Sequence, residues 1–170
     1  MPITRLNHAV LFVADVERSV AFYRDVLGFT PIEAMAQLPG AAFLRAAGST
    51  NDHDLGLFEI GSAAAPSPAG RTSVGLYHLA WEVDTLAALR RVQAALAEHG
   101  ALGGASDHGT TKSLYGRDPD GLEFEVVWII PADLLDEQAL SARARISPLD
   151  LDREIERYGA ETRGGVGISG

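Results

Sequence analysis

The sequence contains no cysteine, which excludes disulfide bonds, thiolate metal sites and a cysteine nucleophile. Any metal must therefore be held by His, Asp or Glu side chains. No apolar run approaches the roughly 20 residues that a helix needs to cross a bilayer. The first residues, Met-Pro-Ile-Thr-Arg, also lack the apolar stretch of a signal peptide. These absences predict a cytoplasmic protein that has no membrane partner.

Basic residues are scarce. Lys and Arg together number 14 against 23 Asp and Glu, so the formal net charge is −9, and Lys112 is the only lysine. Proteins that bind nucleic acids or anionic membranes carry a basic surface, so this balance argues against both partners. The 170 residues are 46% hydrophobic and 22% charged, a mixture typical of a globular chain with one sizeable core.

The first half of the chain is predicted to begin with a strand followed by a helix. Leu6–Val13 is rich in apolar and β-branched residues, Asp15 follows it as an N-cap, and Gly28 ends the helix. Three shorter strands are expected at Phe29–Met35, Ala41–Ala46 and Asp54–Ile60. A stretch of Ala, Ser, Pro and Gly over residues 61–72 then has the composition of a linker.

The same pattern restarts after the linker. Leu76–Val83 predicts a strand, Asp84 or Thr85 caps the following helix, and Gly100 ends it. Two further strands are expected at Ser113–Arg117 and Glu123–Ile130.

A shift of 70 residues superposes the two halves and places His8 on His78. Because a histidine recurs at the same place in the first strand of each half, the pattern predicts pseudo-two-fold symmetry with a site where the halves meet. We therefore expect one α+β domain over residues 1–131, made of one module over about 5–61 and a second over about 73–130.

The remaining residues, 132–170, have a different character and are predicted to form a helical extension. Asp133–Arg143 indicates a polar helix, and Ser147-Pro148 is typical of the start of another, which Gly159 would end. The small residues Gly164–Gly170 are expected to fray. These polar and apolar helices could pack on a second copy, so a homodimer is one expectation.

Three side chains from three predicted strands make a candidate metal site. His8 and His78 occupy equivalent strands, and Glu125 lies on the last strand, on the opposite face from Phe124 and Trp128. A carboxylate on an apolar strand is costly unless it is paired or bound to a metal. Two His and one carboxylate can bind a divalent metal on one face and leave positions open. Taken singly, either histidine could instead be a hydrogen-bonded strand residue, and Glu125 could face solvent.

Several motifs resemble the vicinal oxygen chelate superfamily over roughly residues 5–130. They are Leu6–Val10 (LNHAV), Phe22–Phe29 (FYRDVLGF), Tyr77–Asp84 (YHLAWEVD) and the final hairpin Lys112–Glu125 (KSLYGRDPDGLEFE), which Asp107-His108-Gly109 precedes. The resemblance implies paired βαβββ modules that form a cupped mixed sheet around a divalent metal.

A second resemblance concerns the reaction. Asn51–Phe58 is similar to a strand entry of type I extradiol ring-cleaving dioxygenases, in which a histidine at the position of His53 is an acid–base catalyst. Tyr115 precedes Glu125 by ten residues, as in those enzymes, and His108 resembles a further site histidine. If Pro119-Asp120-Gly121 is a three-residue loop, Tyr115 lies directly opposite Glu125. The resemblance implies Fe(II), or Mn(II), acting with dioxygen on a catechol.

Two alternatives remain. A glyoxalase-like lyase or isomerase would use Glu59 as a fourth ligand, and a drug-resistance binding protein of the same fold would need no metal. Leu122 stands where the family hairpin commonly has Asn, and Asp52 stands where larger dioxygenases have a second His. Four aromatic side chains could form either a binding wall or core: Phe12, Phe43, Phe58 and Trp81.

Overall fold

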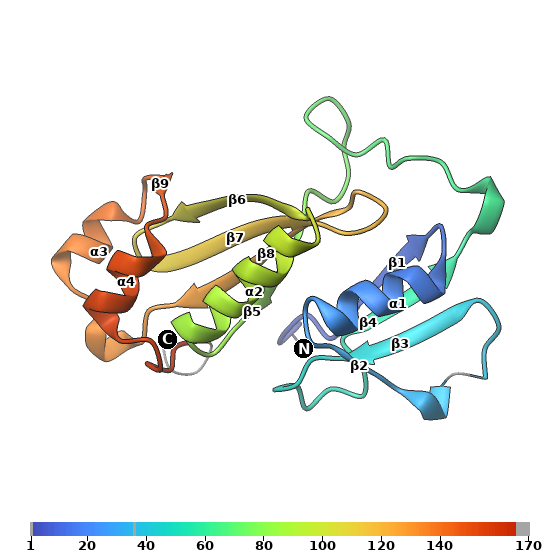
Figure 1. Cartoon of the computed structure of the whole chain (residues 1–170), viewed down its shortest axis with the longest axis horizontal. Helices are drawn as coiled ribbons and strands as arrows, with labels where there is room; N and C mark the ends of the chain where they lie inside the picture. The colour runs from blue at the N-terminus through green and yellow to red at the C-terminus, as the bar shows by residue number, and fades with distance from the viewer. Residues whose placement is uncertain (1, 36, 166–170) are drawn as a thin grey trace. The chain divides into compact units, whose positions relative to one another are not determined.

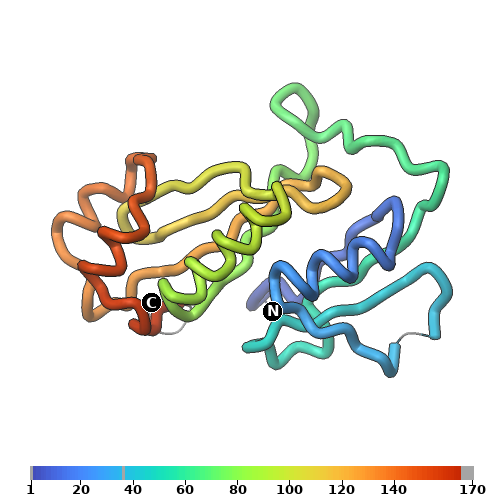
Figure 2. The backbone as a smooth tube through the Cα atoms, viewed as in Figure 1, coloured from blue at the N-terminus to red at the C-terminus, as the bar shows by residue number. Residues whose placement is uncertain are grey.

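The computed structural model describes residues 2–35 and 37–165 (Figures 1 and 2). The chain divides into two compact units, the first of residues 1–67 with Asp118–Gly121, and the second of residues 68–117 and 122–170. Both units combine helices with a mixed sheet, so the α+β prediction is confirmed. No helix in the described residues has the length and apolarity to cross a membrane.

The first unit is a four-stranded sheet with one helix, α1 (Val16–Asp25). The strand order is β1-β4-β3-β2, and β1 pairs parallel with β4. The strands are β1 (Ala9–Val13), β2 (Thr30–Pro31), β3 (Ala41–Arg45) and β4 (Leu55–Glu59). Short 3-10 turns occupy Glu33–Met35 and Gly61–Ala63.

Burial alternates along β1 and shows which face of this sheet forms the core. Leu11 and Val13 are buried, whereas Val10 and Phe12 are 51% and 73% exposed. The buried residues share the α1 side with Leu57 of β4. Successive strand side chains point to opposite faces. The opposite face, which carries Val10 and Phe12, is therefore open within the unit.

The second unit is a five-stranded sheet in the order β5-β8-β7-β6-β9. Its strands are β5 (Leu79–Glu82), β6 (Leu102–Asp107), β7 (Thr111–Arg117), β8 (Glu123–Ile129) and β9 (Ser147–Pro148). Its helices are α2 (Leu86–Glu98), α3 (Glu137–Ala142) and α4 (Leu151–Tyr158), with a 3-10 turn at Ala132–Leu134. Helix α2 packs against α4 and also against β8 (Figure 1).

The alternation predicted for β8 is confirmed. Phe124, Val126 and Trp128 are each at most 2% exposed. Glu125 and Val127, on the other face, are only partly buried. This second face is open within the unit, as the corresponding face is in the first unit.

The predicted helix boundaries agree where the sequence supplies a cap. Asp15 accepts a hydrogen bond from the amide of Arg18 at 2.9 Å and begins α1, and Thr85 caps α2 in the same way. Gly28 has φ +75°, a left-handed backbone conformation that glycine adopts with little strain because it has no Cβ. The caps therefore satisfy helix-end groups that would otherwise lack partners.

Two predictions, on one strand and on the last helix, were wrong, and one strand was missed. The strand expected over Phe29–Met35 is limited to Thr30–Pro31, because the chain enters the 3-10 turn Glu33–Met35, where the Met35 amide donates to the Ile32 carbonyl at 3.0 Å. Ser147-Pro148 does not start a helix but pairs with β6, and Asp150 caps α4 instead. The Gly-rich strand β6 was not expected, since it lacks the β-branched residues that usually mark strands.

The predicted C-terminal extension also differs in detail. The polar helix expected over Asp133–Arg143 is shorter, since Asp136 caps α3 at Glu137. The prediction that Gly164–Gly170 frays is wrong for Gly164, whose amide donates to the carbonyl of Asp84 at 2.9 Å. Residues 166–170 lie outside the described residues.

Candidate metal and acid–base site

In the second unit, adjacent strands bring His78 and Glu125 together. β5 pairs in parallel with β8 so that Ala80 lies beside Glu125, and His78 precedes Ala80 by two residues on the same face. His78 Nε2 lies 3.2 Å from Glu125 Oε2. The two side chains are 24% and 15% exposed. The carboxylate thus faces an imidazole across neighbouring strands, at a site that solvent partly reaches.

Tyr115 completes this cluster, and its predicted position opposite Glu125 is confirmed by the register of β7 and β8. The Tyr115 hydroxyl lies 3.5 Å from Glu125 Oε1, a long hydrogen bond, and 2.9 Å from His108 Nε2. Burial, followed by the charge of Glu125, raises the pKa of Tyr115. The phenol therefore keeps its proton at neutral pH and can act as a hydrogen-bond donor.

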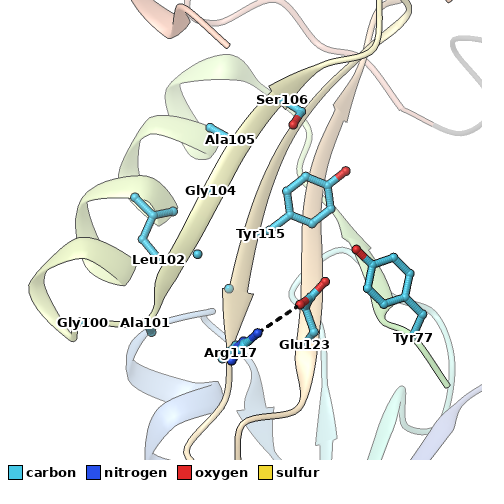
Figure 3. Close-up of a pocket in the computed structure, with 12 residues that line it drawn as sticks. Tyr77, Gly100, Ala101, Leu102, Gly104, Ala105, Ser106, Tyr115, Arg117 and Glu123 are labelled. Carbon is cyan, nitrogen blue, oxygen red and sulfur yellow. Dashed lines mark ion pairs between the residues drawn. The ribbon is translucent and has the colours of Figure 1, made fainter. Parts of the chain in front are cut away.

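A cavity of about 550 Å³ adjoins Tyr115 on the second unit (Figure 3). The Gly-rich strand β6 forms one side, where Gly104 lies opposite Tyr115 and a Cβ would meet nothing within 4 Å. Tyr77 and Glu123 line the cavity near Tyr115, and a hydrogen bond from Tyr77 to Glu123 raises the pKa of Tyr77. The open space arises because β6 presents small residues beside a large aromatic ring.

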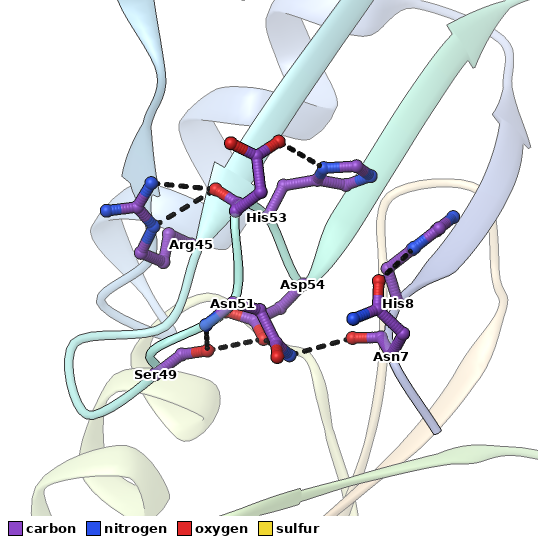
Figure 4. A network of polar contacts seen from close by, with 8 residues as sticks. Asn7, His8, Arg45, Ser49, Asn51, His53 and Asp54 are labelled. Carbon is purple, nitrogen blue, oxygen red and sulfur yellow. Dashed lines mark hydrogen bonds and ion pairs between the residues drawn. The ribbon is translucent and has the colours of Figure 1, made fainter. Parts of the chain in front are cut away.

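In the first unit, His8 and His53 lie together just before the two parallel strands β1 and β4. Figure 4 shows both histidines, whose ring centroids are 4.4 Å apart. The ring of Phe43 is 5.1 Å from that of His53. Because Ala9 pairs with Leu55 at the start of the two strands, His8 lies one residue before β1 and His53 two residues before β4. The His53 side chain is 15% exposed, whereas His8 is exposed.

A hydrogen-bond network that the sequence did not predict holds the loop of His53. The Asp54 carboxylate accepts from the Ser49 hydroxyl and from the side-chain amide of Asn51 at 2.7 Å each (Figure 4). It also accepts from the backbone amide of Ala46 at 2.8 Å. Burial favours the neutral carboxyl, but these hydrogen bonds prevail and lower the pKa of Asp54. The Ser, Asn and Asp side chains of residues 49–54 are suited to such a network, because they readily hydrogen-bond to nearby groups of the chain.

Asn7 orients His8, which sequence reasoning also missed. His8 Nδ1 lies 2.7 Å from Asn7 Oδ1, and Asn51 donates to the Asn7 carbonyl at 2.8 Å (Figure 4). Metal-binding histidines usually donate their other ring nitrogen to such an oxygen. The contact leaves Nε2 as the ring nitrogen of His8 that is available to a ligand. Asn7 directly precedes the histidine, so this adjacency was the available signal.

The donor set of the second unit fits part of a divalent metal site. Ligands held at about 2.0–2.2 Å from one metal, at right angles, lie about 3 Å apart, which matches the His78–Glu125 separation. His78 Nδ1 is buried without a hydrogen-bond partner among the described residues. No group of three His, Asp or Glu in the described part of the chain is placed to hold a metal. His8 belongs to the first unit, so its membership of the ligand set stays a prediction.

The structure also assigns the four aromatic side chains to faces. Phe12 pairs with Phe58 and Phe43 with Gly56 on the open face of the first unit, and the Phe43 and Phe58 rings are 5.9 Å apart. Trp81 pairs with the buried Val126, on the face that α2 covers. Three of the four rings therefore lie on an open face, and Trp81 belongs to the core side.

Glu59 lies in the first unit, on the face of the sheet opposite to its open face. Its carboxylate accepts a hydrogen bond from the amide of Val16 at 3.0 Å, at the N-terminus of α1. A negative charge at this end of a helix is favourable. Glu59 shares the α1 side with Leu57, away from Phe58.

Comparison with known proteins identifies the family of the chain. The family model described as "Glyoxalase/Bleomycin resistance protein/Dioxygenase superfamily" matches residues 5–126. A catechol-2,3-dioxygenase of Bacillus subtilis (strain 168) is 33% identical over 123 residues, which are 72% of this chain. The chain spans only 41% of that relative's length.

Solved structures share the fold. A glyoxylase/bleomycin resistance protein/dioxygenase domain from Frankia sp. EAN1pec has a TM-score of 0.60 at 20% identity, and covers 74% of this chain and 92% of its own. A lactoylglutathione lyase from Agrobacterium tumefaciens has a TM-score of 0.54 at 25% identity, and the match covers 75% of this chain and 95% of the lyase chain. Since the family model covers well over half of the sequence, the chain belongs to the glyoxalase/bleomycin resistance protein/dioxygenase superfamily.

Proposed function

We propose that the protein is an Fe(II)-dependent extradiol dioxygenase that cleaves a catechol with dioxygen. The observation that carries this proposal is the series of contacts from His108 through Tyr115 to Glu125 and His78. It joins two proposed acid–base groups to two proposed metal ligands. The catechol-2,3-dioxygenase relative supports the same reaction.

The proposed ligands are His8, His78 and Glu125. Two imidazoles and one carboxylate are the donor set of non-haem Fe(II) sites, and Mn(II) has compatible chemistry. When bound, the metal would supply positive charge for a deprotonated diol and an electronic link between the diol and dioxygen. Asn7 would hold the His8 ring with Nε2 available, through the Nδ1 contact described above.

His53 is the proposed general base. An imidazole can take a proton from a catechol hydroxyl and return it later in the reaction to an oxygen derived from the substrate or from dioxygen. Its Nδ1 lies 3.1 Å from Asp52 Oδ2, so Nε2 is the nitrogen that would face the substrate. The Asp54 network holds the backbone that carries this ring. Phe43, next to His53, offers an apolar surface for the aromatic ring of the substrate.

Tyr115 is the proposed hydrogen-bond donor to a substrate oxygen. Its raised pKa keeps the hydroxyl protonated, and a donor aimed at developing negative charge stabilises a transition state. His108 Nε2 contacts the same hydroxyl, so its imidazole orients the phenol. His53 would thus transfer the substrate proton, while Tyr115 would donate a hydrogen bond to a substrate oxygen.

The position of Glu59 argues against the glyoxalase-like alternative. A fourth ligand should lie on the same open face as Phe58, whereas the Glu59 carboxylate accepts from the Val16 amide on the α1 side. A metal-free binding protein is disfavoured because it has no use for the His78–Glu125 pair. The lactoylglutathione lyase neighbour keeps the lyase reaction as the second candidate.

Metal analysis and oxygen uptake test the proposal. Purified protein reconstituted with Fe(II) should contain about one metal per chain and consume oxygen with catechol. Glu125→Gln should lose the metal, and the matched variant Glu59→Gln should keep both metal and activity. Loss of metal in Glu59→Gln, without aerobic reaction of the wild-type protein, would favour the lyase. Tight catechol binding by protein that takes up no metal would favour the binding protein.

A further inference from the structure

The turn between β6 and β7 carries His108 and has a tightly determined backbone. The Gly109 amide donates to Asp107 Oδ1 at 2.8 Å, and the His108 amide donates to the Thr111 carbonyl at 3.0 Å. His108 Nε2 lies 2.9 Å from the Tyr115 hydroxyl. Since the backbone is held on both sides of His108, the position of its imidazole depends on whatever holds this turn.

Helix α3 of the C-terminal extension packs directly on the turn. A Cβ on Gly109 would lie 2.5 Å from the Ala139 carbonyl oxygen and 2.8 Å from the Arg143 amide nitrogen, both far inside normal contact. Ala139 itself is 2% exposed. The backbone of the extension therefore approaches the backbone of the turn so closely that only glycine fits between them.

The only lysine of the chain ties α4 to the strand that follows the same turn. Lys112 Nζ lies 2.6 Å from Asp107 of β6 and 2.9 Å from Glu154 of α4. Lys112 is 1% exposed and Glu154 4% exposed. The ring of Tyr158 of α4 contacts that of Trp128 of β8, with the centroids 5.6 Å apart and the planes tilted by 51°. A buried charge of this kind needs its partners to stay in place, so α4 is held against β6, β7 and β8.

We propose that residues 132–158 of the C-terminal extension are a positioning element for the acid–base residues. Through Gly109, α3 holds the His108 turn. Through Lys112, α4 holds the strands on both sides of that turn. Lys112 pairs with Trp128 on the helix-covered face, so the extension acts from behind the sheet while Tyr115 lies on the open face. The inference rests on the proposed function, because His108 matters only if Tyr115 is used.

Gly109→Ala tests the contact, and Gly121→Ala is its matched control. Both glycines have φ near +80°, but a Cβ at Gly121 meets nothing within 4 Å. The comparison therefore separates the displacement of α3 from backbone strain. Gly109→Ala should lower kcat about tenfold or more with KM for catechol within about twofold, since small misplacements of catalytic groups are costly. Metal content should not change, and Gly121→Ala should behave as the wild type.

A second readout does not depend on activity. Nitrogen-15 NMR of the histidine rings in metal-free protein should show the His108 resonance of Gly109→Ala displaced toward its position in Tyr115→Phe, where the contact is lost. If Gly109→Ala does not fold, Glu154→Gln replaces it and should displace the same resonance. An unmoved His108 resonance in the folded variant overturns the inference. If the wild type cleaves no catechol but the resonance moves, the proposed function fails and the positioning role stands.

Discussion

Replacing Tyr115 with phenylalanine removes one hydroxyl from the centre of the proposed acid–base network. The hydroxyl lies 2.9 Å from His108 Nε2 and 3.5 Å from Glu125 Oε1. The short contact to His108 is the stronger of the two, and losing it costs about 1 kcal/mol of folding free energy. Losing the donor to a substrate oxygen should cost more, because such groups contribute about a hundredfold or more to the rate. A hundredfold is about 2.7 kcal/mol of activation free energy.

Three measurements separate these effects. Tyr115→Phe should keep its metal, bind catechol anaerobically with little change, and consume oxygen about a hundredfold more slowly. Tyr77→Phe is the matched control, because its hydroxyl hydrogen-bonds Glu123 rather than Glu125, and it should keep kcat within about threefold. Wild-type turnover in Tyr115→Phe would make this residue a structural one. Equal loss in both variants would refute the reasoning from the His108 contact.

Three further predictions concern the first unit. His53→Phe should retain metal and catechol binding while ring cleavage slows about a hundredfold or more, which oxygen-consumption rates check; lost metal would instead make His53 a ligand. Asp54→Asn should lower the free energy of unfolding at pH 7 by about 1–3 kcal/mol, measured by urea denaturation. The pKa of Asp54 is lowered in the folded protein. Its contribution to the free energy of unfolding is therefore fully present above the unfolded pKa of about 3.9 and is lost as pH falls through the folded pKa. The stability of Asp54→Asn should accordingly decline less in acid than that of the wild type. Leu57→Ala should lower the free energy of unfolding by about 2–5 kcal/mol, because its side chain is buried. The Phe12 side chain is 73% exposed, so Phe12→Ala should lower it by less than about 1 kcal/mol but weaken catechol binding.

Local patterns in the sequence determined much of the framework. The caps Asp15 and Thr85 mark helix starts because their side chains satisfy nearby amides, an interaction that spans three residues. Alternation along β8 placed Glu125 opposite Phe124 for an equally local reason. The spacing of Tyr115 and Glu125 predicted their register, because a short turn leaves adjacent antiparallel strands little freedom to slide.

Tertiary structure decided which faces and edges these elements use. The alternation of residues along β1 could not predict whether Phe12 lies in the core, because that depends on which side of the sheet α1 covers. Glu59 caps α1 through a contact 43 residues away in sequence, and β6 forms a strand because β7 supplies its hydrogen-bond partners. The packing of α3 on Gly109 likewise joins segments about 30 residues apart. Such contacts depend on burial and backbone pairing between distant segments, which local propensity does not encode.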